Sequence, residues 1–118
     1  MFRAGKAVRK RARAVTPESP AEALHDLRKR AKELRYLLEA FAPLYGTPAR
    51  RTVRDLKRVQ DVLGAFQDAQ VQLSAVQDYV NGLTAVPAAF DDYAAVLENR
   101  LHRARADLAP RLTAFLSR

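Results

Sequence analysis

The sequence predicts an all-α fold, an antiparallel four-helix bundle in which residues 1–118 form a single domain. Three observations support this prediction. The chain contains only four glycines and six prolines, and most of them cluster at three breaks. Between the breaks, apolar residues recur at the spacing of amphipathic helices, and no segment alternates as a strand would. The links between segments are short, which favours antiparallel neighbours.

The breaks at residues 16–20, 46–48 and 82–87 divide the chain into four helical segments. The expected segments run from Phe2 to Val15, Pro20 to Tyr45, Pro48 to Asn81 and Pro87 to Leu116. In the second segment, we expect Ser19 to be the N-cap, Glu22 to lie in the first turn, and Pro43 to kink or end the helix early. Asp91 and Asp92 lie near the positive N-terminal end of the fourth segment.

The first segment, residues 1–15, carries six Lys and Arg residues and no acid. Its apolar stripe is thin, since it consists of little more than Val8, Ala12 and Val15. Short helices with so little apolar surface are marginal without a partner or a ligand. We therefore expect a basic N-terminal helix or a partly disordered segment, with disorder at its start.

The second segment combines an apolar face with a basic one. At about 100° of rotation per residue, the core-facing positions of this helix are Leu24, Leu27, Ala31, Leu34, Leu38 and Phe41. The opposite face carries His25, Arg28, Lys29, Lys32, Arg35, Tyr36 and Glu39. Like charges at i,i+3 and i,i+4 repel, so this arrangement is tolerated more readily if an anion or a carboxylate from another helix neutralises it. The pattern predicts an anion-binding stripe.

The third segment also has two faces. Its predicted core positions are Leu56, Val59, Leu63, Phe66 and Leu73, and its polar stripe consists of Arg50, Arg54, Lys57, Asp61, Gly64 and Asp68. A glycine in the middle of a helix costs about 1 kcal/mol relative to alanine. Gly64 therefore indicates a close approach of a backbone, a side chain or a ligand, with a tolerated accident as the alternative.

A formal net charge of +8 predicts an anionic partner. The chain lacks cysteine, a glycine-rich phosphate loop, a Ser/His constellation and a metal motif, so we expect no catalysis, no cofactor and no metal site.

No apolar stretch approaches a membrane span or a secretory signal, so the expected location is the cytoplasm without membrane attachment. The competing function is nucleic-acid binding, because a basic helical domain attracts any phosphate backbone.

Two stretches resemble a known family. Residues 24–36 carry the spaced pattern H-x-x-R-K-x-x-K-x-x-R-Y from His25 to Tyr36, and residues 56–68 carry L-x-x-V-x-x-x-L-G-x-x-x-D from Leu56 to Asp68. Together these patterns resemble the CHAD domain, the conserved histidine α-helical domain, and specifically its C-terminal half. The resemblance spans about residues 24–71.

The resemblance implies a non-catalytic, helical module that binds inorganic polyphosphate, often beside a triphosphate-tunnel (CYTH) domain. Carried over by position, the groove residues would be His25, Arg28, Lys29, Lys32, Arg35 and Lys57, and we add Arg54 because it shares the polar stripe of the third segment. Tyr36, Glu39, Asp61 and Asp68 would orient these cations, and Gly64 is a further supporting residue through its place on the polar stripe. A CHAD domain usually has two four-helix halves, so we expect either a homodimer or a missing N-terminal half. For His25, as for His102, the alternative is an exposed histidine without a role.

Overall fold

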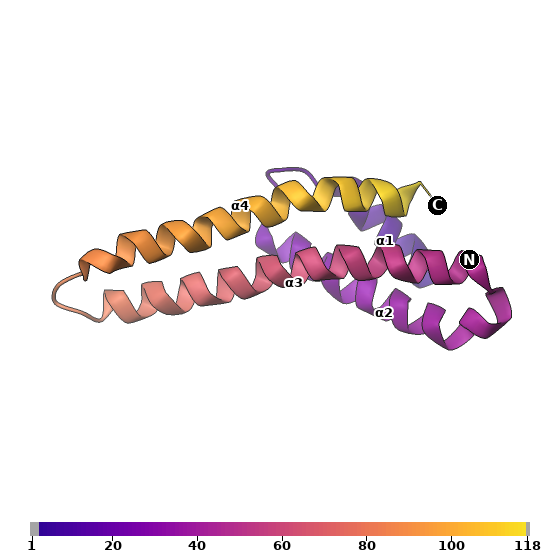
Figure 1. Cartoon of the computed structure of the whole chain (residues 1–118), viewed down its shortest axis with the longest axis horizontal. Coiled ribbons are helices and arrows are strands. Elements are labelled where there is room, and N and C mark those ends of the chain that lie inside the picture. The colour runs from indigo at the N-terminus through magenta and orange to yellow at the C-terminus, as the bar shows by residue number, and fades with distance from the viewer. Residues whose placement is uncertain (1–2, 118) are drawn as a thin grey trace.

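A computed structural model describes residues 3–117 of the chain (Figure 1). It contains four helices: α1 (Arg3–Ala14), α2 (Ala21–Tyr45), α3 (Thr47–Asn81) and α4 (Ala88–Leu116). The predicted all-α fold with four helices is confirmed. The expected beginning of the first helix at Phe2 lies outside the described residues, and so do the first two residues, where we expected disorder.

The helix boundaries differ from the prediction at the start of α2. The prediction of Ser19 as N-cap is wrong, because Pro20 occupies that position and no side chain caps the helix. Ser19 is instead buried, and its Oγ accepts a hydrogen bond from the backbone N–H of Thr16 at 2.8 Å. Its hydroxyl therefore stabilises the turn before the helix. Pro43 does not end α2, which continues for two residues beyond it.

A single residue, Gly46, separates α2 from α3. It has a φ of 68°, a left-handed conformation that side chains with a Cβ rarely adopt. Its N–H donates to the carbonyl of Ala42 at 2.8 Å and closes the last turn of α2, while α3 begins at the next residue. This tight reversal makes α2 and α3 antiparallel neighbours along their lengths.

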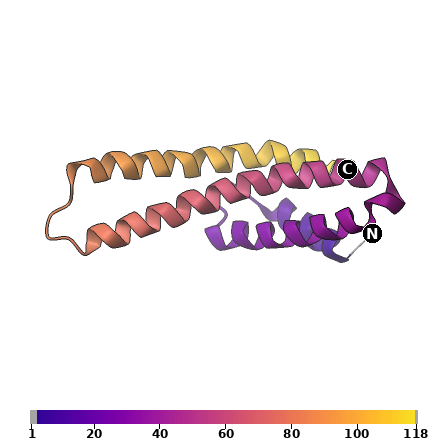
Figure 2. The same ribbon diagram turned by 60° about the horizontal axis from the view of Figure 1, so that its bottom comes forward.

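The molecule is elongated because α3 and α4 form a long hairpin that α1 and α2 cover at one end only (Figures 1 and 2). Its principal extents are 60 × 23 × 19 Å, and its radius of gyration is 17.2 Å. A compact chain of 100 residues has a radius of gyration of about 13 Å. The four helices thus form a bundle over the covered end of the hairpin, and we call residues 75–96 of the uncovered end the arm.

The core lies where all four helices meet. Leu27, Ala31 and Leu56 are fully enclosed, and the other predicted core positions Leu24, Leu34, Val59, Leu63 and Phe66 are also buried. From α1, Val8 and Ala12 join the same cluster, and from α4, Leu108, Leu112 and Phe115 do. Leu38 and Leu73 are half-buried. The apolar stripe of α1, although thin, is therefore sufficient to dock it.

The prediction that Phe41 belongs to the core is wrong, since 38% of this residue is exposed. The reason is the length of α1. Arg11 pairs with Asp26, and α1 runs antiparallel to α2, so Arg3 lies level with about Leu34. The last turns of α2 extend past that point, so Phe41 lies beyond the part of α1 that the structure describes.

Candidate functional site

The basic stripe of α2 lies along the flank of the helix that adjoins α3. Arg28 and Arg35 are half-buried at the boundary between the two helices, while His25, Lys29 and Lys32 are exposed. Arg28 and Arg35 are seven residues apart, a separation of about two helical turns or about 10.5 Å along the axis. The structure therefore sets the cations along the seam where α2 packs against α3, which we call the α2–α3 groove.

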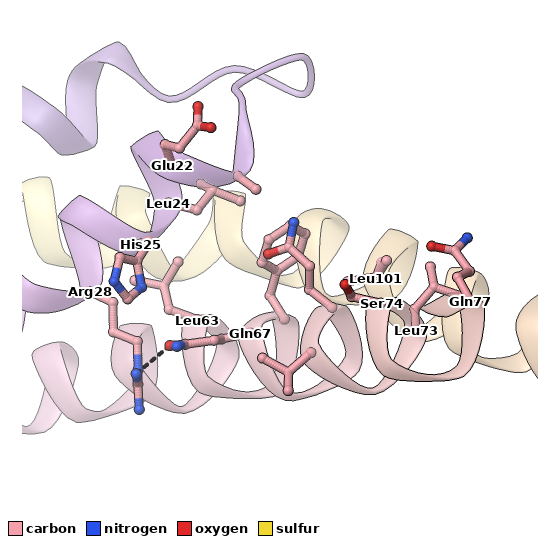
Figure 3. A pocket seen from close by; sticks show the side chains of 14 residues that line it. Glu22, Leu24, His25, Arg28, Leu63, Gln67, Leu73, Ser74, Gln77 and Leu101 are labelled. Carbon is pink, nitrogen blue, oxygen red and sulfur yellow. Dashed lines mark hydrogen bonds between the residues drawn. The ribbon is translucent and has the colours of Figure 1, made fainter. Parts of the chain in front are cut away.

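A hydrogen bond across the groove fixes Arg28. Its Nη1 donates to the Oε1 of Gln67 on α3, and Figure 3 shows the guanidinium extended toward that amide. A guanidinium has five N–H donors in a planar fork, so one bond to an amide leaves donors for a ligand. Arg28 is thus held in place and remains able to bind an anion.

Glu39 lies between two cations that come from different helices. Its Oε1 is 3.9 Å from the Nε of Arg35 on α2 and 3.9 Å from the Nζ of Lys57 on α3. The guanidinium of Arg35 also lies over the ring of Tyr36, 5.1 Å from its centroid. Partly exposed pairs of this kind contribute little to stability, but they restrict where the cations point. Arg35 and Lys57 therefore converge on one carboxylate.

One end of the groove widens into a cavity of about 630 Å³, where α2 begins beside the α3–α4 hairpin. His25 and Arg28 line it from α2, and Gln67, Gln70 and Ser74 are among the α3 residues that line it. Figure 3 shows His25 and Arg28 on the same side of this cavity. Its polar lining combines the Arg28 guanidinium and the His25 imidazole with neutral amides and a hydroxyl, groups that can donate hydrogen bonds to an anion, and it also includes the carboxylate of Glu22.

Other residues of the predicted site lie elsewhere. Arg54 is paired with Asp55, with 3.8 Å between its Nε and the Oδ1 of that buried carboxylate. Asp61 lines a different cavity, between α3 and α4. Asp68 is exposed on α3. At Gly64, a Cβ would meet no protein atom within 4 Å outside its own helix, so no neighbouring backbone or side chain makes the close approach we expected.

The basic residues of α1 have packing roles. Arg11 pairs with Asp26 of α2 and donates to the carbonyl of Ala7 at 3.3 Å. Arg9 donates to the carbonyl of Leu116 at 3.4 Å, and its guanidinium lies 5.1 Å from the centroid of the Phe115 ring. These two arginines tie α1 to its neighbours. Lys6, Lys10 and Arg13 are exposed.

Charge is unevenly divided along the chain. Residues 59–99 contain six acidic residues and no lysine or arginine, a net charge of −6. The rest of the chain contains all 21 Lys and Arg residues and the other seven acids, a net charge of +14. The sequence prediction missed this division because it summed charge over whole segments, and within α3 and α4 the basic and acidic halves nearly cancel. The arm, residues 75–96, contains Asp78, Asp91 and Asp92 and no lysine or arginine, so a polyanion is attracted to the covered end and repelled by the arm.

A family model for the CHAD domain matches residues 1–77, which is more than half of the chain. The chain belongs to the CHAD family. The matched region includes α1, α2 and most of α3, and is wider than the stretch whose motifs carried the resemblance. Neither the comparison with curated proteins nor the comparison with solved structures gave a match.

The part of the chain that matches the family includes the α2–α3 groove, because His25, the stripe cations and Lys57 all lie within residues 1–77. Helix α4 lies outside that region, so the family match does not account for its residues. Among residues 3–117, no helix is both long and apolar enough to cross a membrane. Nor does that part of the CHAD chain bring together three or more potential metal-binding side chains.

Proposed function

We propose that this CHAD chain binds inorganic polyphosphate, or a similar phosphate-rich polyanion, along the α2–α3 groove without catalysing a reaction. The observation that carries the proposal is the line of Arg28, Lys32 and Arg35 on α2. Lys57 joins this line from α3, because Lys57 and Arg35 both lie beside the carboxylate of Glu39. His25 and Lys29 extend the line, while Tyr36 and Glu39 orient it. Cations in a row along a groove suit a flexible linear anion.

The contacts of the groove support this role in a specific way. Arginine forks bind phosphate oxygens in pairs, and charge-assisted hydrogen bonds are about twice as strong as neutral ones. Arg28 is already positioned by Gln67, so less of its freedom is lost when a ligand binds. In the predicted set, Arg54, Asp61 and Asp68 contribute less to this proposal, since no hydrogen bond or ion pair joins them to the stripe within residues 3–117.

Nucleic acid is the competing ligand, because the net charge of +14 outside residues 59–99 attracts any phosphate backbone. The experiment is a titration of the protein with long-chain polyphosphate and with duplex DNA at equal charge concentration, each over a range of salt. Both titrations should be salt-sensitive. We expect polyphosphate to bind more tightly, since a duplex is too wide to follow a groove between two helices. Efficient displacement of polyphosphate by duplex DNA would replace this proposal with nonspecific binding to a basic surface.

The partners of the chain are also proposals. The α2–α3 groove is open to solvent on one side, which leaves room for a second cationic surface to face it. We propose that the facing surface is supplied by a second copy of the chain, with an N-terminal CHAD half or a CYTH-type domain as the alternatives. A long polyphosphate would then bridge the two surfaces.

A further inference from the structure

A second concave site lies on the other flank of α3, where α3 meets α4. Its volume is about 340 Å³, and its lining is dominated by arginine. The charged residues that line it are Arg58, Asp61, Arg100, Arg103, Asp107 and Arg111. Three of the four arginines come from α4, which lies outside the part of the chain that matches the CHAD family.

The two aspartates do not neutralise this site. Arg111 donates from its Nη1 to the backbone carbonyl of Asp107 at 3.1 Å rather than to the carboxylate. Within residues 3–117, no ion pair joins Asp61 or Asp107 to Arg58, Arg100 or Arg103. The charged groups of the lining therefore sum to +2, and three guanidiniums keep their donors available.

The arginines and Asp107 on α4 have the spacing of ion pairs, yet they form none within the described residues. Arg103, Asp107 and Arg111 are each four residues apart, the separation at which opposite charges on a solvated helix face readily pair. Neither arginine pairs with the Asp107 carboxylate. Arg100 and Arg103, three residues apart, repel one another along the same helix. An anion in the cavity would relieve that repulsion.

We propose that this α3–α4 cavity is a second phosphate site, which takes pyrophosphate, a short condensed phosphate or the end of a longer chain. The size and the arginine forks suit a compact phosphate, because each guanidinium offers two parallel N–H groups to phosphate oxygens. The ligand class rests on the proposed function, whereas the site is distinct from the α2–α3 groove. Lys57 and Arg58 are neighbours in sequence, yet Lys57 contacts Glu39 of α2 and Arg58 lines the α4 side.

The test uses the whole chain, pyrophosphate as the probe, and NMR of the arginine Nε–H groups as a readout that identifies the site. Pyrophosphate should shift the signals of Arg58, Arg100 and Arg103 and saturate them. The variant Arg100→Gln/Arg103→Gln should weaken pyrophosphate binding roughly tenfold or more, since it removes two charge-assisted contacts. Both residues are exposed, so helical content should be unchanged.

The matched control is Arg3→Gln/Arg51→Gln, which removes the same charge from exposed positions that line neither the groove cavity nor the α3–α4 cavity. Its effect should stay within about twofold, the size expected of a change in net charge alone at physiological salt. Equal losses in the two variants, or shifts that never saturate, would overturn the proposal.

A third variant separates this inference from the proposed function. Arg28→Gln/Arg35→Gln should weaken the binding of long polyphosphate and leave the saturable pyrophosphate shifts of Arg100 and Arg103 in place. If the wild-type chain shows those shifts but binds no long polyphosphate, the proposed function fails while the second site stands. If long polyphosphate binds and pyrophosphate shifts only Arg28 and Arg35, the second site is refuted.

Discussion

Arg28 of α2 donates a hydrogen bond to Gln67 of α3, and this contact sets the register of the two antiparallel helices. Seven residues further along α2 and seven residues back along α3, Arg35 and Gln60 occupy the equivalent positions. There, the Nε of Arg35 and the Oε1 of Gln60 are buried, and neither has a hydrogen-bond partner among residues 3–117. The groove thus holds one satisfied Arg–Gln pair and one unsatisfied pair at the same helical phase.

This difference predicts opposite effects of one substitution at two positions. Gln67→Leu should lower the free energy of unfolding by about 0.5 to 1.5 kcal/mol, because it removes the partner of Arg28. Gln60→Leu should leave stability unchanged or raise it by about 1 kcal/mol, because it removes a buried acceptor that has no donor. Urea unfolding of the two variants measures both, and a larger loss at Gln60 than at Gln67 would contradict the register.

The burial pattern predicts a contrast between Leu63 and Phe41. Leu63 is 2% exposed, so Leu63→Ala should cost about 2 to 5 kcal/mol of unfolding free energy. Phe41→Ala should cost less, below about 1.5 kcal/mol, although phenylalanine is the larger residue. Chemical denaturation of both variants provides the comparison. A loss below about 0.5 kcal/mol for Leu63→Ala, the range of surface substitutions, would place that residue outside the core.

The position of Glu39 predicts that its substitution increases the affinity of the protein for polyphosphate. Its carboxylate lies 3.9 Å from both Arg35 and Lys57, where it competes with a bound phosphate for the same cations. Glu39→Gln should therefore strengthen polyphosphate binding, by up to about fivefold given the small energies of exposed pairs. Calorimetric titration measures the change. A marked loss of affinity would show that the carboxylate matters more for positioning the cations than for competing with the ligand.

The open groove predicts assembly on a long polyanion. Two copies with a net charge of +8 each repel one another, so association should be weak at low salt and should increase with salt or with long-chain polyphosphate. Sedimentation with and without polyphosphate measures it. A monomer under both conditions would refute the proposed second copy.

The parts of the fold that sequence reasoning predicted are those that depend on local pattern. The apolar phases of α2 and α3 identified Leu27, Leu34, Leu56 and Leu63 as buried, because a helix has one face to bury whatever covers it. Phe41 has the correct phase but lies beyond the part of α1 that the structure describes. How far a neighbouring helix reaches is a property of tertiary packing, and no local signal carries it.

For the site, the stripe from His25 to Glu39 could be predicted because one helix carries it. The sequence could not predict which polar residues of α3 face α2 and which face α4. Lys57 and Asp61 share a broad polar face on a helical wheel, yet Lys57 contacts α2 and Asp61 lines the cavity beside α4. That division depends on where the two neighbouring helices pack around α3. The separation of charge between residues 59–99 and the rest was visible in the sequence, and a running sum of charge would have found it.

The central claim is tested most directly by comparing two triple variants that remove the same charge. One replaces Arg28, Lys32 and Arg35 of the groove with glutamine, and the other replaces the exposed Lys6, Lys10 and Arg13 of α1. Arg9 and Arg11 are left out of the control because they pack α1 against its neighbours. Polyphosphate affinity at one salt concentration is the measurement, with circular dichroism to confirm equal helical content. The groove variant should lose several kcal/mol of binding free energy in total, at about 1.5 to 3 kcal/mol per charge-assisted contact, and the α1 variant much less. An equal or larger loss in the α1 variant would contradict the groove as the binding site.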